Sequence, residues 1–178
     1  MKKILVSIVL LAIVFSGYSQ KVYQTRGGKV SFFSATPLMD IKADNSEVSS
    51  KLSTNGQVIL MIAIRSFNFE NKLMEEHFNE NYMESGKYPK STFQGRVKDI
   101  SNIKFEKDGG YKVLVEGVLE MHGVKKQVAI PASLTIKSGK VYASAEFMVS
   151  MKDYNIKGSY IGTKIASEVK VSFNATYE

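Results

Sequence analysis

Apolar and polar residues alternate with a period of two through most of this 178-residue chain, and this alternation limits the fold more than any other feature. A period of two is the pattern of a β-strand that buries one face and leaves the other in solvent. We therefore predict a mainly β protein. The segments that carry the pattern clearly are residues 56–69, 111–123, 127–139, 140–151 and 167–178.

Short glycine-containing turns separate these segments and indicate how the strands connect. They are Asn55-Gly56, Asp108-Gly109-Gly110, His122-Gly123 and Ser138-Gly139. Links this short join antiparallel neighbours. An antiparallel meander of eight or nine strands forms one barrel or one sandwich, because closure removes exposed strand edges. The count includes weaker candidate strands at residues 29–35, 38–43, 46–53 and 91–100.

Residues 71–83 depart from the alternation. Apolar residues there recur at spacings of three and four, which predicts one amphipathic helix of about three turns. We expect the face toward the strands to carry Leu73, Met74, His77, Phe78, Asn81 and Tyr82. The face expected in solvent carries Glu75, Glu76, Asn79 and Glu80.

The predicted inward face of the strands is aliphatic and aromatic, with small residues at Gly117, Ala143 and Ala145 that leave space. A barrel of eight strands can be filled by its own side chains or can hold one small ligand. The pattern of residues does not separate a filled core from a lined cavity.

The first nineteen residues are typical of a secretory signal peptide. Lys2 and Lys3 precede the uncharged residues 4–15, and Gly17-Tyr18-Ser19 follows as a small-residue exit. The twelve residues 4–15 are too few to span a bilayer, which takes about 20. We expect residues 1–19 to be removed on export, leaving residues 20–178 as one periplasmic or extracellular domain.

The basic balance does not indicate a nucleic-acid partner. Lys and Arg number 24 against 17 acidic residues, but the lysines are scattered among the acids. Nucleic-acid binding proteins instead cluster basic residues beside aromatic platforms. A weak contact with a membrane surface stays open, and so does the oligomeric state, with a dimer as one option.

Neither metal binding nor catalysis is indicated by the residue types. The chain has no cysteine, so it has no thiolate ligand or nucleophile. A helical zinc site places a second ligand at i+4, where His77 is followed by Asn81. The neighbours Glu75 and Glu76 diverge on a helix. We predict no metal, no cofactor and no enzymatic activity. A reaction inside the cavity would have to recruit Arg65, His77, Asn81 and His122.

Three segments resemble the YceI-like family, whose members are described as polyisoprenoid-binding or lipid-binding, lipocalin-like domains. They are KYPKSTF at residues 87–93, GVLEMHGVKKQVAIP at residues 117–131 and KDYNI at residues 152–156. The resemblance covers essentially all of residues 20–178. It implies an extended eight-stranded antiparallel barrel around an apolar cavity, with the helix closing one end.

This resemblance also implies an isoprenoid or another long apolar chain as the ligand. The alternative is a filled barrel that serves the cell envelope as a structural or protein-interaction module without a ligand. The residues predicted to line or cover the cavity are Leu60, Ile62, Phe67, Phe69, Leu73, Met74, His77, Phe78, Tyr82, Phe93, Val115, Leu119 and Phe147.

Overall fold

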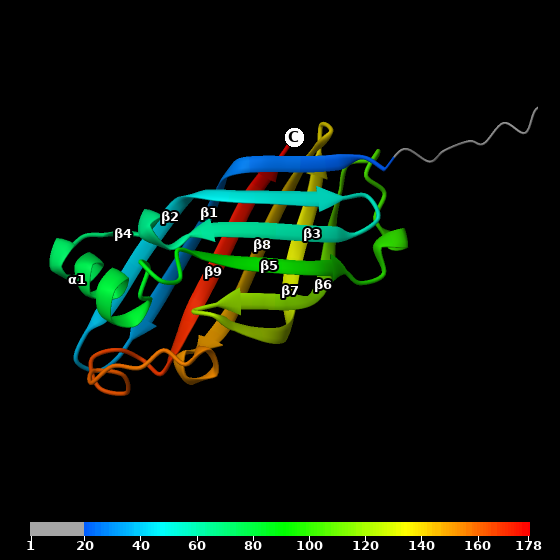
Figure 1. Cartoon of the computed structure of the whole chain (residues 1–178). Coiled ribbons are helices and arrows are strands. Elements are labelled where there is room, and N and C mark those ends of the chain that lie inside the picture. Colours follow the sequence, from blue (N-terminus) through cyan, green and yellow to red (C-terminus); the bar gives the residue numbers. More distant parts are fainter. Residues whose placement is uncertain (1–19) are drawn as a thin grey trace, which may run out of the picture.

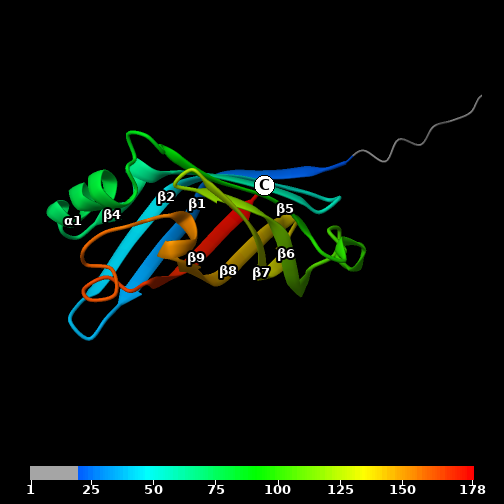
Figure 2. The ribbon, with the colours of Figure 1, turned by 60° about the horizontal axis from the view of Figure 1, so that its bottom comes forward.

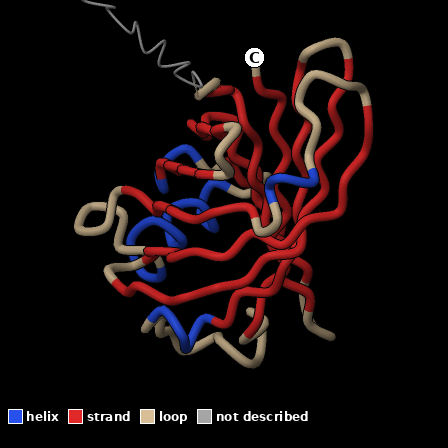
Figure 3. Tube along the Cα trace, turned by 90° about the vertical axis from the view of Figure 1, so that its right-hand side faces the viewer, coloured by secondary structure: helices blue, strands red, loops and turns tan. Residues whose placement is uncertain are grey.

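The fold was taken from a computed structural model, which describes residues 20–178 (Figure 1). The expected signal peptide, residues 1–19, lies outside the described residues. Strands make up most of the trace, and the helices are short segments between them (Figure 3). Within residues 20–178, none of these helices has the length and apolar character needed to cross a bilayer.

Eight long strands close into an antiparallel barrel. Each pairs with its neighbours in the order β1-β9-β8-β7-β6-β5-β3-β2, and β2 pairs again with β1. Figures 1 and 2 show the strands wrapping around one interior. The predicted eight-stranded antiparallel barrel is confirmed. The strands are β1 (Val22–Ala35), β2 (Asp40–Ser53), β3 (Gln57–Ala63), β5 (Lys90–Val97), β6 (Gly109–Met121), β7 (Val124–Lys137), β8 (Lys140–Ser150) and β9 (Glu168–Tyr177).

The alternation places side chains as expected on β3. Val58, Leu60 and Ile62 turn toward the interior, whereas Ile59 and Met61 are about half exposed at 50% and 47%. Successive side chains of a strand point to opposite faces, so Ile59 and Met61 lie outside the barrel although they are apolar.

Strand β2 is longer than the alternation predicts, because residues 38–43 and 46–53 were expected to form separate strands. The alternation is interrupted at Asn45, a fully buried polar residue. Its Nδ2 donates to the carbonyl oxygen of Ala63 at 2.8 Å, and its Oδ1 accepts from the Glu47 amide at 2.8 Å. With its polar atoms paired, Asn45 lies inside one continuous strand.

Two hairpins use the turn chemistry that their sequences predict. His122 and Gly123 between β6 and β7 have φ values of 50° and 74°, and Ser138 and Gly139 between β7 and β8 have 51° and 77°. Positive φ at both central residues is the requirement of a type I′ turn, which matches the twist of paired strands. The turn predictions at these two sites are confirmed.

Pairing between β7 and β8 covers only part of the two strands. It runs from Ala132 with Ala145 to Lys137 with Lys140, while the rest of β8 pairs with β9 alone. A short helix, η4 (Met151–Tyr154), follows β8 and contacts β7, where Lys126 Nζ lies 3.1 Å from Asp153 Oδ1. η4 therefore lies beside the unpaired part of β7. The other 3-10 helices are η1 (Ile64–Ser66) and η3 (Ile100–Asn102).

The predicted helix is present, with an irregular second half. α1 (Lys72–His77) begins after Asn71, whose Oδ1 accepts from the amides of Leu73 and Met74 at 2.9 and 3.4 Å. It continues as a π-helix, η2 (Phe78–Tyr82), in which the Met83 amide donates to the Phe78 carbonyl at 2.8 Å. The pair lies at one end of the barrel beside the two-residue strand β4 (Asn68–Phe69) (Figure 1).

The predicted orientation of this helix is wrong by about one residue. The half-buried positions are Met74, Glu75, Phe78, Asn79 and Tyr82. Leu73, His77 and Asn81, which were expected inward, are exposed. Positions i, i+4 and i+8 thus form the buried stripe, and that spacing suits the wider turn of the π-helix.

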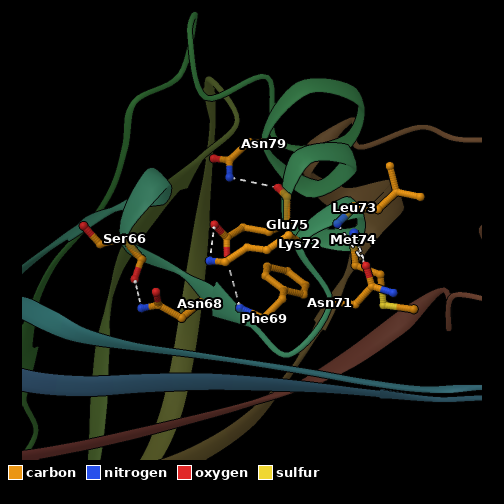
Figure 4. A network of polar contacts seen from close by, with 9 residues as sticks. All are labelled: Ser66, Asn68, Phe69, Asn71, Lys72, Leu73, Met74, Glu75 and Asn79. Carbon is orange, nitrogen blue, oxygen red and sulfur yellow. Dashed lines mark hydrogen bonds and ion pairs between the residues drawn. The ribbon is translucent and has the colours of Figure 1, made fainter.

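Polar contacts explain why Glu75 turns inward (Figure 4). Its Oε2 accepts from the Phe69 amide at 3.2 Å and lies 2.8 Å from Lys72 Nζ. The Lys72 hydrogen bond, then the Phe69 amide, hold the pKa of the Glu75 carboxyl below its usual value. Asn79 Nδ2 donates to the Glu75 carbonyl at 2.9 Å. These contacts attach the helix to β4. The prediction placed Glu75 and Asn79 in solvent because they are polar, and it was wrong because their polar groups have partners here.

Candidate ligand-binding cavity

The barrel holds an apolar cavity at the end where the helix lies. Its volume is about 250 Å³, and barrel strands, the helix and the loop between η4 and β9 all line it. We call this space the outer chamber. Its polar side chains are Ser34, His77, Tyr82, Ser91, Tyr160 and Lys164.

A second space of about 90 Å³ lies farther along the barrel and is lined by strand residues alone. We call it the inner chamber. Five residues line both chambers, so the two spaces adjoin, and we call these five residues the waist. The waist residues are Val30, Ile62, Leu119, Phe147 and Val171.

All but one of the predicted cavity residues line a chamber. The outer chamber has Phe67, Phe69, Met74, His77, Phe78 and Tyr82. The inner chamber has Leu60, Phe93 and Val115. The waist has Ile62, Leu119 and Phe147. Leu73 is the exception, because its side chain is 57% exposed on the outer side of α1. Their contact with a ligand stays a prediction.

Four phenylalanines hold the helix against the barrel. The Phe78 ring from η2 lies 5.5 Å from Phe32, 5.4 Å from Phe67 and 5.1 Å from Phe69, measured between ring centroids. Aromatic pairs at such distances contribute about 0.5–1.5 kcal/mol beyond their buried area. Phe32 was not among the predicted residues, although it follows Val30 on the same face of a weak candidate strand.

A glycine pair gives the inner chamber its width. Gly95 of β5 lies opposite Gly117 of β6, and the Phe93 ring lies close to both. A Cβ added to Gly95 or Gly117 would lie 2.5 or 2.8 Å from Phe93 Cζ, too close for real atoms. The ring therefore follows the wall and leaves the interior open, together with the small side chains of Ala143 and Ala145.

Tyr177 forms part of the inner-chamber wall and is 2% exposed. Its hydroxyl lies 2.7 Å from Ser50 Oγ, which lies 3.1 Å from the Ile59 carbonyl oxygen and donates to it. Burial raises the pKa of Tyr177 from its ordinary 10.0 to about 12, while the Ser50 hydrogen bond opposes the rise. The phenol thus keeps its proton in the folded state at pH values where the unfolded chain loses it.

This pKa difference predicts alkaline destabilisation. Between pH 10 and 12 the unfolded chain binds fewer protons at Tyr177 than the folded protein, so the free energy of unfolding falls as pH rises. The expected slope from this residue approaches about 1.4 kcal/mol per pH unit. Urea unfolding at pH 9 to 11.5 checks it, with Tyr177→Phe as the reference. A wild-type slope no steeper than that of Tyr177→Phe would contradict the assignment.

His122 does more than form its predicted turn. Its ring is 8% exposed, with Nδ1 lying 3.0 Å from the Tyr154 carbonyl oxygen and Nε2 lying 2.7 Å from Glu84 Oε2. A carbonyl oxygen can only accept, so Nδ1 is the donor in the contact with Tyr154. Tyr88 packs against the ring at 4.5 Å between centroids. His122 therefore joins the β6–β7 hairpin to η4 and to the chain after the helix.

Of the four polar residues that a reaction would recruit, only His77 lines a chamber. His77 is exposed at the outer chamber and Asn81 is exposed on η2. Arg65 Nε donates to Ser85 Oγ at 3.2 Å, and both His122 ring nitrogens already have partners. No cluster of three or more His, Cys, Asp or Glu suited to a metal ion occurs within residues 20–178. The arrangement suits binding of an apolar molecule.

Comparison with models of known protein families assigns this chain to a family. A sequence model described as the YceI-like domain matches residues 13–177. The chain belongs to the YceI-like family. The YceI-like match spans the whole barrel, and the family fold is a binding fold that supports an apolar ligand-binding barrel. A comparison with curated protein sequences finds no match.

Solved structures share the YceI-like fold at low identity. A polyisoprenoid-binding domain of Saccharophagus degradans, implicated in plant cell wall breakdown, is 17% identical with a TM-score of 0.77 over 88% of this chain and 97% of its own. BcnA of Burkholderia cenocepacia is 20% identical, with a TM-score of 0.70 over 85% of this chain and 96% of its own. A Campylobacter jejuni YceI protein is 19% identical, with a TM-score of 0.62 over 81% of this chain and 88% of its own.

The three segments that resemble the YceI-like family meet in space. Tyr88 of the first packs on His122 and on Gly123 of the second, where a Cβ at Gly123 would lie 2.7 Å from the Tyr88 ring. Phe93 of the first lies over Gly117 of the second, and Tyr154 of the third pairs with His122. These motif residues therefore join the barrel wall to the segments at its helix end.

Proposed function

We propose that this YceI-like protein is an exported carrier that holds one isoprenoid or other long apolar chain in its two chambers. The observation that carries the proposal is the pair of apolar chambers that meet at a shared waist. Burying one methylene contributes about 0.8 kcal/mol, so an apolar chain can bind with few polar contacts. Two spaces of about 250 and 90 Å³ suit one ligand near the lower end of the usual range, roughly 300–1,000 Å³.

The similarity to known proteins supports the isoprenoid class. The Saccharophagus degradans domain, which matches over 88% of this chain, is described as polyisoprenoid-binding. Because the two proteins are only 17% identical, we propose this ligand class for the present chain by analogy. The chambers count against the alternative of a filled barrel without a ligand. We also infer a carrier role without catalysis, because the chamber lining holds no convergent set of polar groups among residues 20–178.

Export to the periplasm or the extracellular space is the second part of the proposal. Its support is the amino-terminal sequence, in which a lysine pair, an apolar segment and a small-residue exit follow one another. Apolar side chains around the outer chamber support a brief contact with a membrane during loading, since Leu38, Leu73 and Tyr160 are 71%, 57% and 49% exposed. Intact mass of the exported protein checks the cleavage, and the expected mature chain begins at Gln20.

Mass spectrometry of the purified protein tests the ligand. Protein purified from a bacterial host without detergent is extracted with organic solvent, and we expect an apolar long-chain compound at close to one molecule per protein. The extract of an unrelated exported protein serves as the background. A lipid-free extract, combined with no uptake of added isoprenoid, would contradict the proposed function.

A further inference from the structure

Ser91 is an unpaired polar group in the wall of the outer chamber. It lies on β5 opposite Ile62 of β3, and its side chain is 3% exposed. Its Oγ has no hydrogen-bond partner within residues 20–178. Buried polar groups nearly always have a partner, and leaving one unpaired costs about 1–3 kcal/mol. The hydroxyl therefore costs stability in the protein without a ligand.

Ser91 differs from two other buried polar groups in its hydrogen bonding or its position. Ser34 is also fully buried in the outer chamber, but its Oγ accepts from the Ala166 amide at 2.9 Å. Asn79 Oδ1 is also unpaired in the described chain, but Asn79 is not among the chamber residues. Among residues 20–178, Ser91 is thus the buried lining side chain whose hydroxyl neither donates nor accepts a hydrogen bond.

The surroundings of Ser91 do not suit a bound water. A buried water needs two to four polar partners. The chamber residues on the elements that flank Ser91 are apolar, namely Ile62 from β3, Ile64 from η1, and Leu119 and Met121 from β6. The backbone of β5 at Ser91 is paired with β3. One hydroxyl in such a wall suits a ligand that brings both an acceptor atom and an apolar chain.

We propose that Ser91 is the polar anchor of the ligand, donating its hydroxyl hydrogen to an oxygen of a neutral, oxygen-bearing apolar chain. The inference rests on the proposed function and adds the ligand class: an alcohol, ketone or ether rather than a plain hydrocarbon. The oxygen is neutral because the charged or titratable lining residues are exposed (His77, Tyr160 and Lys164) or half-buried (Tyr82), and an ion beside Ser91 would be buried without a counter-charge.

A competition between two matched compounds tests the anchor. Phytanol and phytane share one branched isoprenoid skeleton and differ by one hydroxyl. Lipid-free protein is incubated with equal amounts of both, and the retained compounds are measured by gas chromatography with mass spectrometry. We expect Ser91→Ala to lower the retained phytanol-to-phytane ratio about 5- to 10-fold relative to wild type, as the loss of one hydrogen bond predicts.

Two further variants make the result decisive. Ser34→Ala removes a second hydroxyl from the same chamber, one that accepts from the Ala166 amide, and should leave the ratio at the wild-type value if Ser91 alone anchors the ligand oxygen. Ser91→Cys keeps the side-chain branching, with a slightly larger atom that is a weak donor, and should lower the ratio even if Ser91→Ala does not fold.

The outcomes separate this inference from the proposed function. An unchanged ratio in Ser91→Ala or Ser91→Cys, or an equal drop in Ser34→Ala, overturns the anchor while the carrier function stands. Retention of neither compound by the wild-type protein contradicts the carrier function itself.

Discussion

The Ile62→Phe variant is expected to fold and to lose most of its affinity for apolar chains, by at least about tenfold. Ile62 lines both chambers, so a phenyl ring at the waist fills the space that the proposed ligand would cross. A ligand confined to one chamber leaves two or more methylenes in water, at about 0.8 kcal/mol each. Displacement of a fluorescent long-chain probe by phytanol measures the change.

Ile59→Phe is the matched control for this variant. Ile59 lies on the same strand, β3, but is 50% exposed outside the barrel. The same substitution there changes composition and strand propensity equally and leaves the chambers untouched. We expect wild-type affinity. Equal affinities of the two variants would show that the chain does not cross the waist.

The His122→Ala variant is expected to lose about 3 kcal/mol of unfolding free energy. It leaves the buried Tyr154 carbonyl without its partner and removes the ring against which Tyr88 packs. A buried unpaired polar group costs about 1–3 kcal/mol. Histidine is several-fold more frequent than most non-glycine residues at a positive φ, so alanine at a φ of 50° costs about another 0.5–1 kcal/mol. Chemical denaturation followed by circular dichroism measures the loss.

Ser138→Ala separates the backbone part of this effect from the side-chain part. Ser138 holds the equivalent position in the other type I′ turn, with a φ of 51°, and is exposed. Its replacement should cost well under about 1 kcal/mol, because serine and alanine bring the same Cβ into the left-handed region. Equal losses in the two variants would mean that the contacts of His122 add nothing to stability.

The barrel was predictable because strand periodicity is a local property that repeats. A two-residue turn such as His122-Gly123 makes the two strands that it joins antiparallel neighbours. The alternation that includes Leu60 and Ile62 shows which side chains of β3 point inward. An error in one strand does not propagate to the next. Family resemblance added the closed topology that alternation alone had left open between barrel and sandwich.

The helix face was mispredicted because local hydrogen bonds decided it. The carboxylate of Glu75 is held by the Phe69 amide and Lys72, and Leu73 therefore turns to solvent. Contacts of this kind join residues whose spacing carries no periodic signal. The π-helix at Phe78–Tyr82 further changes the period on which the prediction relied.

Ser91 and the partners of His122 could not be predicted for a different reason. Whether a serine has a partner depends on atoms brought from distant strands, as the Ser34 bond to Ala166 shows. His122 meets Glu84 and Tyr154 across separations of 38 and 32 residues. The useful sequence signal is a polar residue at an inward position of an alternating strand, as at Ser91 two residues before Phe93.

A crystal structure of the protein loaded with phytanol tests the carrier function most directly. The two-chamber cavity predicts one elongated feature of density that runs from the outer chamber past Ile62 and Phe147 into the inner chamber, with its oxygen within hydrogen-bonding distance of Ser91 Oγ. Chambers filled by the protein's own side chains, with the lipid absent or bound on the outer surface, would contradict it.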